Sequence, residues 1–297
     1  MAPISREHYI QRMKIPLLNM TRPKLWFVCG ILLMSGLSQA AAADASAWDK
    51  DTHSAVRLIA GNTAAGSQTM QAGVSLAIED GWKTYWRYPG DSGVPPRFDF
   101  SGSDNVGAVT VAWPAPQGFE DGGGISIGYK HDVVFPLKIT PREPGKPVVL
   151  KLKAEYAVCE NLCVPATGKA ELTLDGRPSS LAGAVADAQA KVPQAAAPGA
   201  AGDLSLVSLH RENGTPKQQA IVDIRAAPDE KLQIFVEGPS PAWALPLPRQ
   251  QSGAPAGQQR FVFALDGVPS GATLKGTELR FTIVGKDNAT DVRARLD

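Results

Sequence analysis

Short runs in which apolar and polar residues alternate recur along most of the chain. Between residues 53 and 174 these runs lie at residues 74–88, 106–113, 132–140, 148–158 and 168–174. A period of two residues is typical of strands that bury one face. Asp80-Gly81, inside the first run, has the composition of a hairpin turn. Several such strands at this spacing predict a β-sandwich over residues 48–175.

The run at residues 148–158 shows the alternation most clearly. Its apolar residues fall on one face and are Leu152, Ala154, Tyr156 and Val158. Its charged residues fall on the other face and are Lys151, Lys153 and Glu155. We therefore expect a strand with one face in a core and the other in water.

The same pattern returns after a segment rich in Ala, Pro and Gly. Residues 176–202 have this composition and predict a linker, with one short helix at residues 179–192. Beyond the linker, strands are predicted at residues 204–210, 218–226, 231–238, 259–267 and 278–285. Residues 203–297 are therefore expected to form a second, smaller β-sandwich, which makes the predicted fold class all-β.

The first 43 residues have the features of a secretory signal peptide. Arg22 and Lys24 precede an apolar run at residues 25–37, and small residues follow it. A membrane-spanning helix needs roughly 20 apolar residues, which this run lacks. We expect cleavage between Ala40 and Ala43 and export of the remainder, with an uncleaved anchor as the alternative.

Charge and composition argue against several function classes. The chain has 297 residues, and 30 Lys and Arg stand against 29 Asp and Glu, so no strongly basic surface for nucleic acid is expected. With 29 Gly and 24 Pro, long helices are disfavoured. His53, His131 and His210 are scattered without the spacing of metal ligands. We predict no metal, no cofactor and no nucleic-acid partner.

Two cysteines follow the predicted signal peptide, Cys159 and Cys163. They lie between the end of one predicted strand and the start of the next, so the two thiols close the mouth of a hairpin. In an oxidising compartment such a pair can form a disulfide. A disulfide that closes a loop of about five residues stabilises the fold by only roughly 2 kcal/mol, because it removes little conformational entropy from the unfolded chain. At this point the cysteine pair can be interpreted either as a structural disulfide or as a redox-active one.

Four sequence blocks follow one another at residues 78–86, 113–121, 126–129 and 156–165. They read IEDGWKTYW, WPAPQGFED, SIGY and YAVCENLCVP, and in this order they resemble the periplasmic N-terminal domain of the thiol:disulfide interchange protein DsbD. The counterpart of that domain in the suppressor of copper sensitivity protein B is more similar still. The resemblance covers roughly residues 50–175 and implies an immunoglobulin-like domain. The copper-sensitivity relatives carry a second β domain, which suits residues 203–297.

The resemblance also implies which residues do the chemistry. Cys159 and Cys163 would be the redox pair, supported by aromatic rings and by the acidic start of a cap loop. The supporting residues are Tyr85, Phe119, Glu120, Asp121 and Tyr129. Glycines at 122–124 stand where the family's cap carries aromatic residues, so Phe119 is the ring left to shield the sulfurs. We expect small thiols to reduce a disulfide with so little shielding rapidly.

The sequence thus predicts a periplasmic thiol:disulfide interchange protein, a thiol-disulfide oxidoreductase of the protein-disulfide reductase type. It relays electrons through the Cys-x3-Cys pair to or from a thioredoxin-fold partner and takes no small-molecule substrate. Because no membrane domain follows, a separate membrane protein is the expected electron donor. Two alternatives stay open: an envelope binding or structural module with a structural disulfide, and a copper(I)-handling protein.

Overall fold

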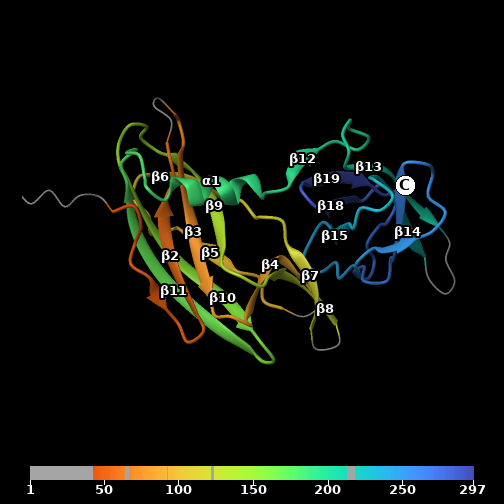
Figure 1. Cartoon of the computed structure of the whole chain (residues 1–297), viewed down its shortest axis with the longest axis horizontal. Coiled ribbons are helices and arrows are strands. Elements are labelled where there is room, and N and C mark those ends of the chain that lie inside the picture. The colour runs from red at the N-terminus through yellow and green to blue at the C-terminus, as the bar shows by residue number, and fades with distance from the viewer. Residues whose placement is uncertain (1–42, 64–66, 92, 122–123, 213–217) are drawn as a thin grey trace, which may run out of the picture. The chain divides into compact units, whose positions relative to one another are not determined.

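A computed structural model describes residues 43–297 except residues 64–66, 92, 122–123 and 213–217 (Figure 1). The predicted signal peptide therefore lies outside the described residues, apart from its last position. In the part of the chain that is described, no helix is long and apolar enough to cross a membrane. The described residues belong to one compact unit.

The described chain is mostly β structure with one short helix, as the alternating pattern predicts. The strands before the helix are β1 (Asp49–Lys50), β2 (Ser54–Ala60), β3 (Met70–Ile78), β4 (Lys83–Gly90), β5 (Arg97–Asp99), β6 (Val106–Val111), β7 (Gln117–Asp121), β8 (Gly124–Tyr129), β9 (Val133–Pro141), β10 (Val148–Cys159) and β11 (Cys163–Leu174). The helix is α1 (Ala182–Ala190). The strands after it are β12 (Gln194–Ala196), β13 (Ser205–Glu212), β14 (Gln219–Arg225), β15 (Gln233–Glu237), β16 (Arg249–Gln251), β17 (Gln258–Ala264), β18 (Glu278–Val284) and β19 (Ala289–Arg295).

Two antiparallel sheets, which we call the first sheet pair, enclose one core. One has the strand order β1-β2-β3-β9-β6, and the other has the order β11-β10-β4-β8-β7 with β5 also paired to β10. Both sheets contribute large buried side chains to this core, such as Phe135 from β9 and Trp86 from β4. The face of β10 that the sequence predicts to be apolar is buried at Leu152, Ala154, Tyr156 and Val158.

The turn at Asp80-Gly81 joins two sheets and not two paired strands. Gly81 has a φ of 87°, and the Trp82 N–H donates to the Glu79 carbonyl at 3.0 Å, so a tight turn is present. However, β3 pairs with β2 and β9, whereas β4 pairs with β10 and β8. The hairpin prediction is wrong because strands from elsewhere in the chain occupy the positions beside β3 and β4.

The remaining strands, which we call the second sheet pair, have a separate core. Their sheets have the orders β12-β19-β18-β15 and β13-β14-β17-β16. β12 pairs with β19 in parallel, and the other described pairings in these sheets are antiparallel. Trp243, Phe261 and Phe281 are among the buried rings of this core. The five strands predicted in this half are all present as β13, β14, β15, β17 and β18.

The segment predicted as a linker, residues 176–202, carries regular structure. The expected helix is present as α1 (Figure 1). Its Val185 is buried beside Gly73 of β3. Nine residues of helix are followed by β12, which adds to the edge of β19. The segment is therefore attached to the first sheet pair through α1 and to the second through β12.

Candidate functional site

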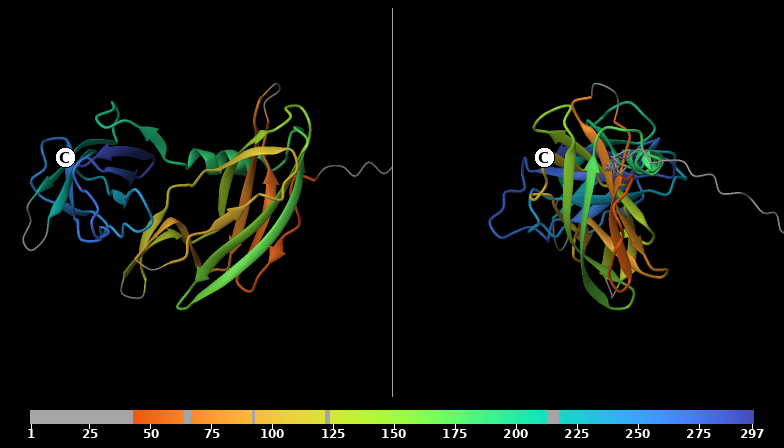
Figure 2. Two further views of the ribbon diagram at one scale, coloured as in Figure 1. Left: turned by 180° about the vertical axis from the view of Figure 1, so that it is seen from behind. Right: turned by 90° about the vertical axis from the view of Figure 1, so that its left-hand side faces the viewer.

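β10 and β11 form a long hairpin, which is green in Figure 2. The two cysteines are its last residue pair. These two strands pair without interruption from Val148 opposite Leu174 to Cys159 opposite Cys163. A disulfide joins the two cysteines. The prediction that the thiols close the mouth of a hairpin is confirmed, because the uninterrupted register brings Cys159 and Cys163 directly opposite each other.

The two cysteines differ in their exposure to solvent. Cys159 is only 1% exposed, whereas Cys163 at the start of β11 is exposed. Between them, Leu162 is 75% exposed, which is unusual for a large apolar side chain. An attacking thiol therefore has access from the side of Cys163 and Leu162.

Tyr85 of β4 brings a hydroxyl group to the disulfide. Its oxygen lies 2.7 Å from Sγ of Cys159 and 3.0 Å from Sγ of Cys163, and the side chain is fully buried. Because disulfide sulfurs carry no proton, the hydroxyl is the donor. β4 is positioned for this contact by its pairing with β10, where Lys83 lies opposite Cys159. The structure thus brings Tyr85 to the cysteines, as the resemblance implies.

A loop that follows β4 covers the ring of Tyr85. A Cβ added to Gly93 would lie 2.5 Å from both Cδ1 and Cε1 of that ring, so only glycine fits without movement. The loop is tied to β8, because Asp91 Oδ2 accepts the Ile125 N–H at 2.9 Å and the Asp91 N–H donates to the Ile125 carbonyl at 2.9 Å. Sequence reasoning missed Gly93, whose only sequence signal is a turn-like stretch rich in Gly and Pro.

Lys83 links the hairpin tip to Phe119. Its Nζ donates to the Glu160 carbonyl at 3.2 Å and lies 5.4 Å from the centroid of the Phe119 ring. Nζ of Lys130 lies over the same ring at 5.2 Å. Phe119 is buried in this position. Phe119 therefore lies beside the hairpin tip, and Lys83 lies between its ring and Glu160.

The two acidic residues predicted to support the pair, Glu120 and Asp121, lie on β7. Glu120 is exposed on β7. Asp121 ends the same strand, and its side chain lies outside the described residues together with residues 122–123 of the cap loop.

Tyr129 lies on the core side of the sheet. It pairs opposite Thr84, the neighbour of Tyr85, and adjacent residues of a strand point to opposite faces. Its hydroxyl donates to the Pro114 carbonyl at 2.9 Å, and its ring packs edge-on against Phe135. Burial raises the pKa of Tyr129 well above its ordinary value, so the hydroxyl stays protonated. The structure therefore separates Tyr129 from the sulfurs.

Within the described ranges, no group of three or more His, Cys, Asp or Glu residues is arranged to hold a metal ion. His53 is engaged elsewhere: its ring stacks on Trp82 with centroids 3.8 Å apart, and its Nδ1 lies 2.8 Å from Oε2 of Glu79. The chemistry that these residues support is centred on the disulfide and the Tyr85 hydroxyl.

Two comparisons show which known proteins this chain is similar to. Residues 55–175 match the family model described as "Thiol:disulfide interchange protein DsbD, N-terminal". The chain is also similar in structure to the N-terminal periplasmic domain of ScsB from Proteus mirabilis. The TM-score is 0.67 at 22% sequence identity, over 86% of this chain and 99% of that one. A search of the curated proteins finds no match.

Proposed function

We propose that the protein is a periplasmic thiol:disulfide interchange protein, because residues 55–175 match the DsbD N-terminal family model. Its Cys159–Cys163 disulfide exchanges electrons with a partner of the thioredoxin fold. The observation that carries the proposal is the geometry of the pair: one cysteine is exposed, the other is buried, and a tyrosine hydroxyl contacts both sulfurs.

The same match supports an immunoglobulin-like fold for the first sheet pair. The structural similarity to the ScsB domain extends over 86% of this chain, which includes much of the second sheet pair. We assign residues 48–175 and 203–297 to two immunoglobulin-like domains on that ground. A periplasmic location is proposed from the predicted signal peptide and from the location of the ScsB relative.

The exchange begins with attack on the exposed sulfur. A thiolate of the partner attacks Sγ of Cys163, a bond forms between the partner's sulfur and Cys163, and the bond from Cys163 to Cys159 breaks. Cys159 leaves as a thiolate that accepts the hydrogen bond of the Tyr85 hydroxyl. A hydrogen bond to a charged group is among the stronger ones in proteins, so this contact favours bond cleavage.

A second partner thiol completes the transfer. It loses its proton and attacks the partner's own first sulfur, which forms the partner's disulfide and releases Cys163. The partner has then lost two electrons, and this protein holds a dithiol at Cys159 and Cys163. The reverse sequence of steps passes the two electrons onward to an oxidised partner.

Trapping a mixed disulfide tests this order. In Cys159→Ser, Cys163 is the thiol of the pair that remains, and its neighbour cannot displace a bound partner. We expect this variant to accumulate a covalent complex with a thioredoxin that retains only its attacking cysteine, supplied as an activated mixed disulfide. Cys163→Ser is the matched control and should react much more slowly, because Cys159 is buried. Non-reducing electrophoresis measures both.

Failure of both single-cysteine variants to form the complex would contradict the proposal. A reduction potential of the native disulfide below about −300 mV would also contradict it and favour a structural bridge.

A further inference from the structure

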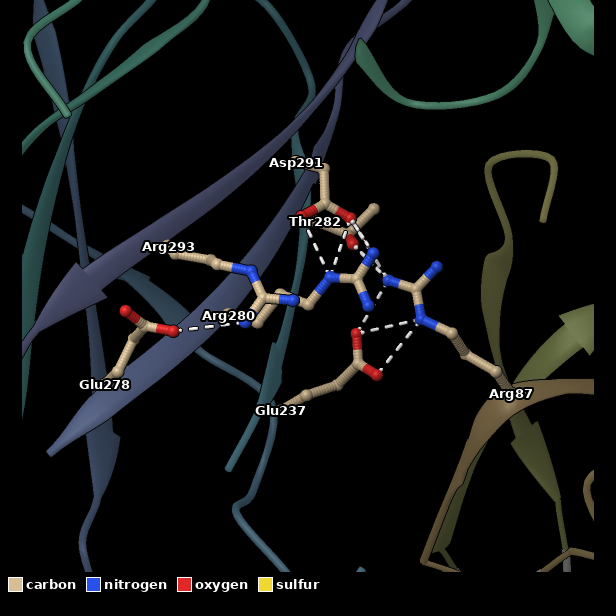
Figure 3. A network of polar contacts seen from close by, with 7 residues as sticks. All are labelled: Arg87, Glu237, Glu278, Arg280, Thr282, Asp291 and Arg293. Carbon is tan, nitrogen blue, oxygen red and sulfur yellow. Dashed lines mark hydrogen bonds and ion pairs between the residues drawn. The ribbon is translucent and has the colours of Figure 1, made fainter. Parts of the chain in front are cut away.

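Arg87 of β4 lies two residues beyond Tyr85 and is bound by the second sheet pair (Figure 3). Its Nε and Nη2 donate to the carboxylate of Glu237 on β15, with a shortest distance of 2.7 Å. Nη2 also lies 3.2 Å from Oγ1 of Thr282 and 3.3 Å from Oδ2 of Asp291. One side chain therefore contacts three strands of a sheet that is distant in sequence.

The charges in this cluster are mostly buried and balanced. The side chains of Arg87, Glu237 and Asp291 are 15%, 16% and 13% exposed. Arg280 binds the same Asp291 through Nε at 2.9 Å and Nη2 at 2.7 Å. Two guanidinium groups thus stand against two carboxylates, and removing Arg87 would leave one buried carboxylate without its counter-charge.

Other contacts fix the same stretch of β4. The Tyr88 hydroxyl donates to the Leu245 carbonyl at 3.2 Å. The Trp86 ring lies 5.9 Å from the ring of Phe235, and Cζ of Arg87 lies 3.8 Å from the centroid of the Trp86 ring. Three consecutive residues of β4, from Trp86 to Tyr88, are therefore held by side chains and backbone of the second sheet pair or by each other.

These contacts are made by the part of β4 that is not paired regularly with neighbouring strands, residues 86–89. The pairing with β10 covers Lys83 and Thr84. The pairing with β8 breaks after Tyr85 and resumes at Gly90, so that residues 86–89 stand opposite Ile127 alone. An interruption of this kind leaves residues without ladder partners and allows the strand to bend. The backbone just beyond Tyr85 therefore depends on contacts from outside the ladder.

We propose that Arg87 is a positioning residue for the redox pair, and that the second sheet pair acts through it to hold the Tyr85 hydroxyl against the sulfurs. Arg87 itself touches neither sulfur in the described contacts. The inference rests on the proposed thiol-disulfide exchange and assigns a task to the second sheet pair in that exchange. β7 is supported from the same side, because the Gly118 N–H donates to Oε1 of Gln233 at 2.9 Å.

If Arg87 positions Tyr85, substitution of either residue should shift the thiol-disulfide equilibrium in the same direction. Tyr85→Phe removes the hydroxyl that donates to the Cys159 thiolate released in the exchange. The equilibrium of this variant with a glutathione redox buffer should therefore shift about tenfold toward the disulfide. Arg87→Leu should shift it several-fold in the same direction. Glu237→Gln removes the carboxylate charge that binds Arg87 without changing β4. It should shift the equilibrium in the same direction, which covers the case in which Arg87→Leu fails to fold.

A double variant shows whether the effect passes through Tyr85. If it does, adding Arg87→Leu to Tyr85→Phe should change the equilibrium no further. The matched control is Arg260→Leu, which breaks the ion pair of Arg260 with Asp223 inside the second sheet pair and should leave the equilibrium unchanged. All variants are made in the full chain.

The outcomes separate this inference from the proposed function. A shift in Tyr85→Phe with none in Arg87→Leu and Glu237→Gln overturns the positioning role and leaves the exchange proposal standing. An equal shift in Arg260→Leu, or additive shifts in the double variant, also overturns the positioning role. A native disulfide that neither glutathione nor a thioredoxin-fold protein reduces overturns both.

Discussion

The hydroxyl of Tyr85 must be placed within a few tenths of an ångström, because hydrogen bonds weaken quickly with distance and angle. The resemblance placed Tyr85 near the cysteines from sequence alone. Arg87 carried no such signal, since its partners Glu237, Thr282 and Asp291 are 150, 195 and 204 residues away in the chain. A single arginine in a strand is ordinarily expected to face solvent.

A second buried charge gives the second sheet pair a dependence on pH. Asp223 accepts Nε and Nη2 of Arg260 at 2.8 and 2.9 Å and the hydroxyl of Ser208 at 3.1 Å. The Arg260 hydrogen bonds are the main cause that lowers the pKa of Asp223, against the opposing effect of burial. A carboxyl group whose pKa is lower in the folded than in the unfolded chain stabilises the fold at pH values above the unfolded pKa, which is about 4. This contribution is lost as the pH falls further, through the pKa of the folded state.

We therefore expect Asp223→Asn to lower the free energy of unfolding by about 2 kcal/mol at pH 7. The difference from the native protein should begin to shrink below about pH 4, where Asp223 of the unfolded chain becomes protonated. It should vanish at a lower pH, where Asp223 of the folded protein is protonated as well. Urea unfolding followed by tryptophan fluorescence at several pH values measures this. Asp203→Asn, at an exposed position, is the control. A difference that stays constant down to acid pH would contradict the assignment.

At the scale of elements, the hairpin of β10 and β11 is the best-predicted part of the chain. Apolar and polar residues alternate over much of both strands, the strands pair without interruption over twelve residues each, and the connection is short. Local pattern therefore sets the register that pairs Cys159 with Cys163. The strands on either side of Asp80-Gly81 have equally clear patterns. Their partners are chosen by long-range packing, and local pattern does not identify them.

The hairpin tip leads to a prediction about docking. Leu162 is exposed between the cysteines, and an exposed apolar side chain beside an attacked sulfur is suited to contact a partner protein. Leu162→Asp should slow reduction by thioredoxin about tenfold, equivalent to about 1.4 kcal/mol, and leave reduction by dithiothreitol nearly unchanged. Stopped-flow fluorescence gives both rates.

Asn161→Asp is the matched control for that experiment, because it adds the same charge at the neighbouring exposed position without removing apolar surface. If Asn161→Asp slowed thioredoxin as much as Leu162→Asp did, charge and not apolar contact would explain the effect. Equal slowing of dithiothreitol and thioredoxin by Leu162→Asp would show that the tip itself had been distorted.

At the scale of the whole described unit, the two cores are connected through Phe235. This residue belongs to β15 of the second sheet pair, yet it is 1% exposed and packs in the core of the first. Its ring faces Trp86, the neighbour of both Tyr85 and Arg87. The apolar contact and the Arg87 cluster thus join the same two sheets and strengthen each other.

This continuity predicts cooperative unfolding. The native protein should show a single calorimetric transition, and Phe235→Ala, which should cost about 3–5 kcal/mol, should separate it into two. Phe263→Ala is the control, because Phe263 lies wholly within the second core and packs against Phe281. That variant should be destabilised as well. A single transition retained in Phe235→Ala would contradict the connection.

Local sequence pattern is enough to predict that this protein is built of short alternating strands, that a helix interrupts them near residue 185, and that Cys159 and Cys163 meet at a hairpin mouth. These features depend on side-chain periodicity and turn chemistry over a few residues, which any window of the chain records.

Other features could be seen only in the tertiary structure. They are the exposure of Cys163, the orientation of Tyr129 toward the core, the contact of Gly93 with the ring of Tyr85, and the binding of Arg87 by a sheet distant in sequence. Each of these depends on which strands become neighbours, and therefore on side chains separated by tens to hundreds of residues. Burial and ion pairing across such distances arise only when the whole chain packs, so no local pattern carries them.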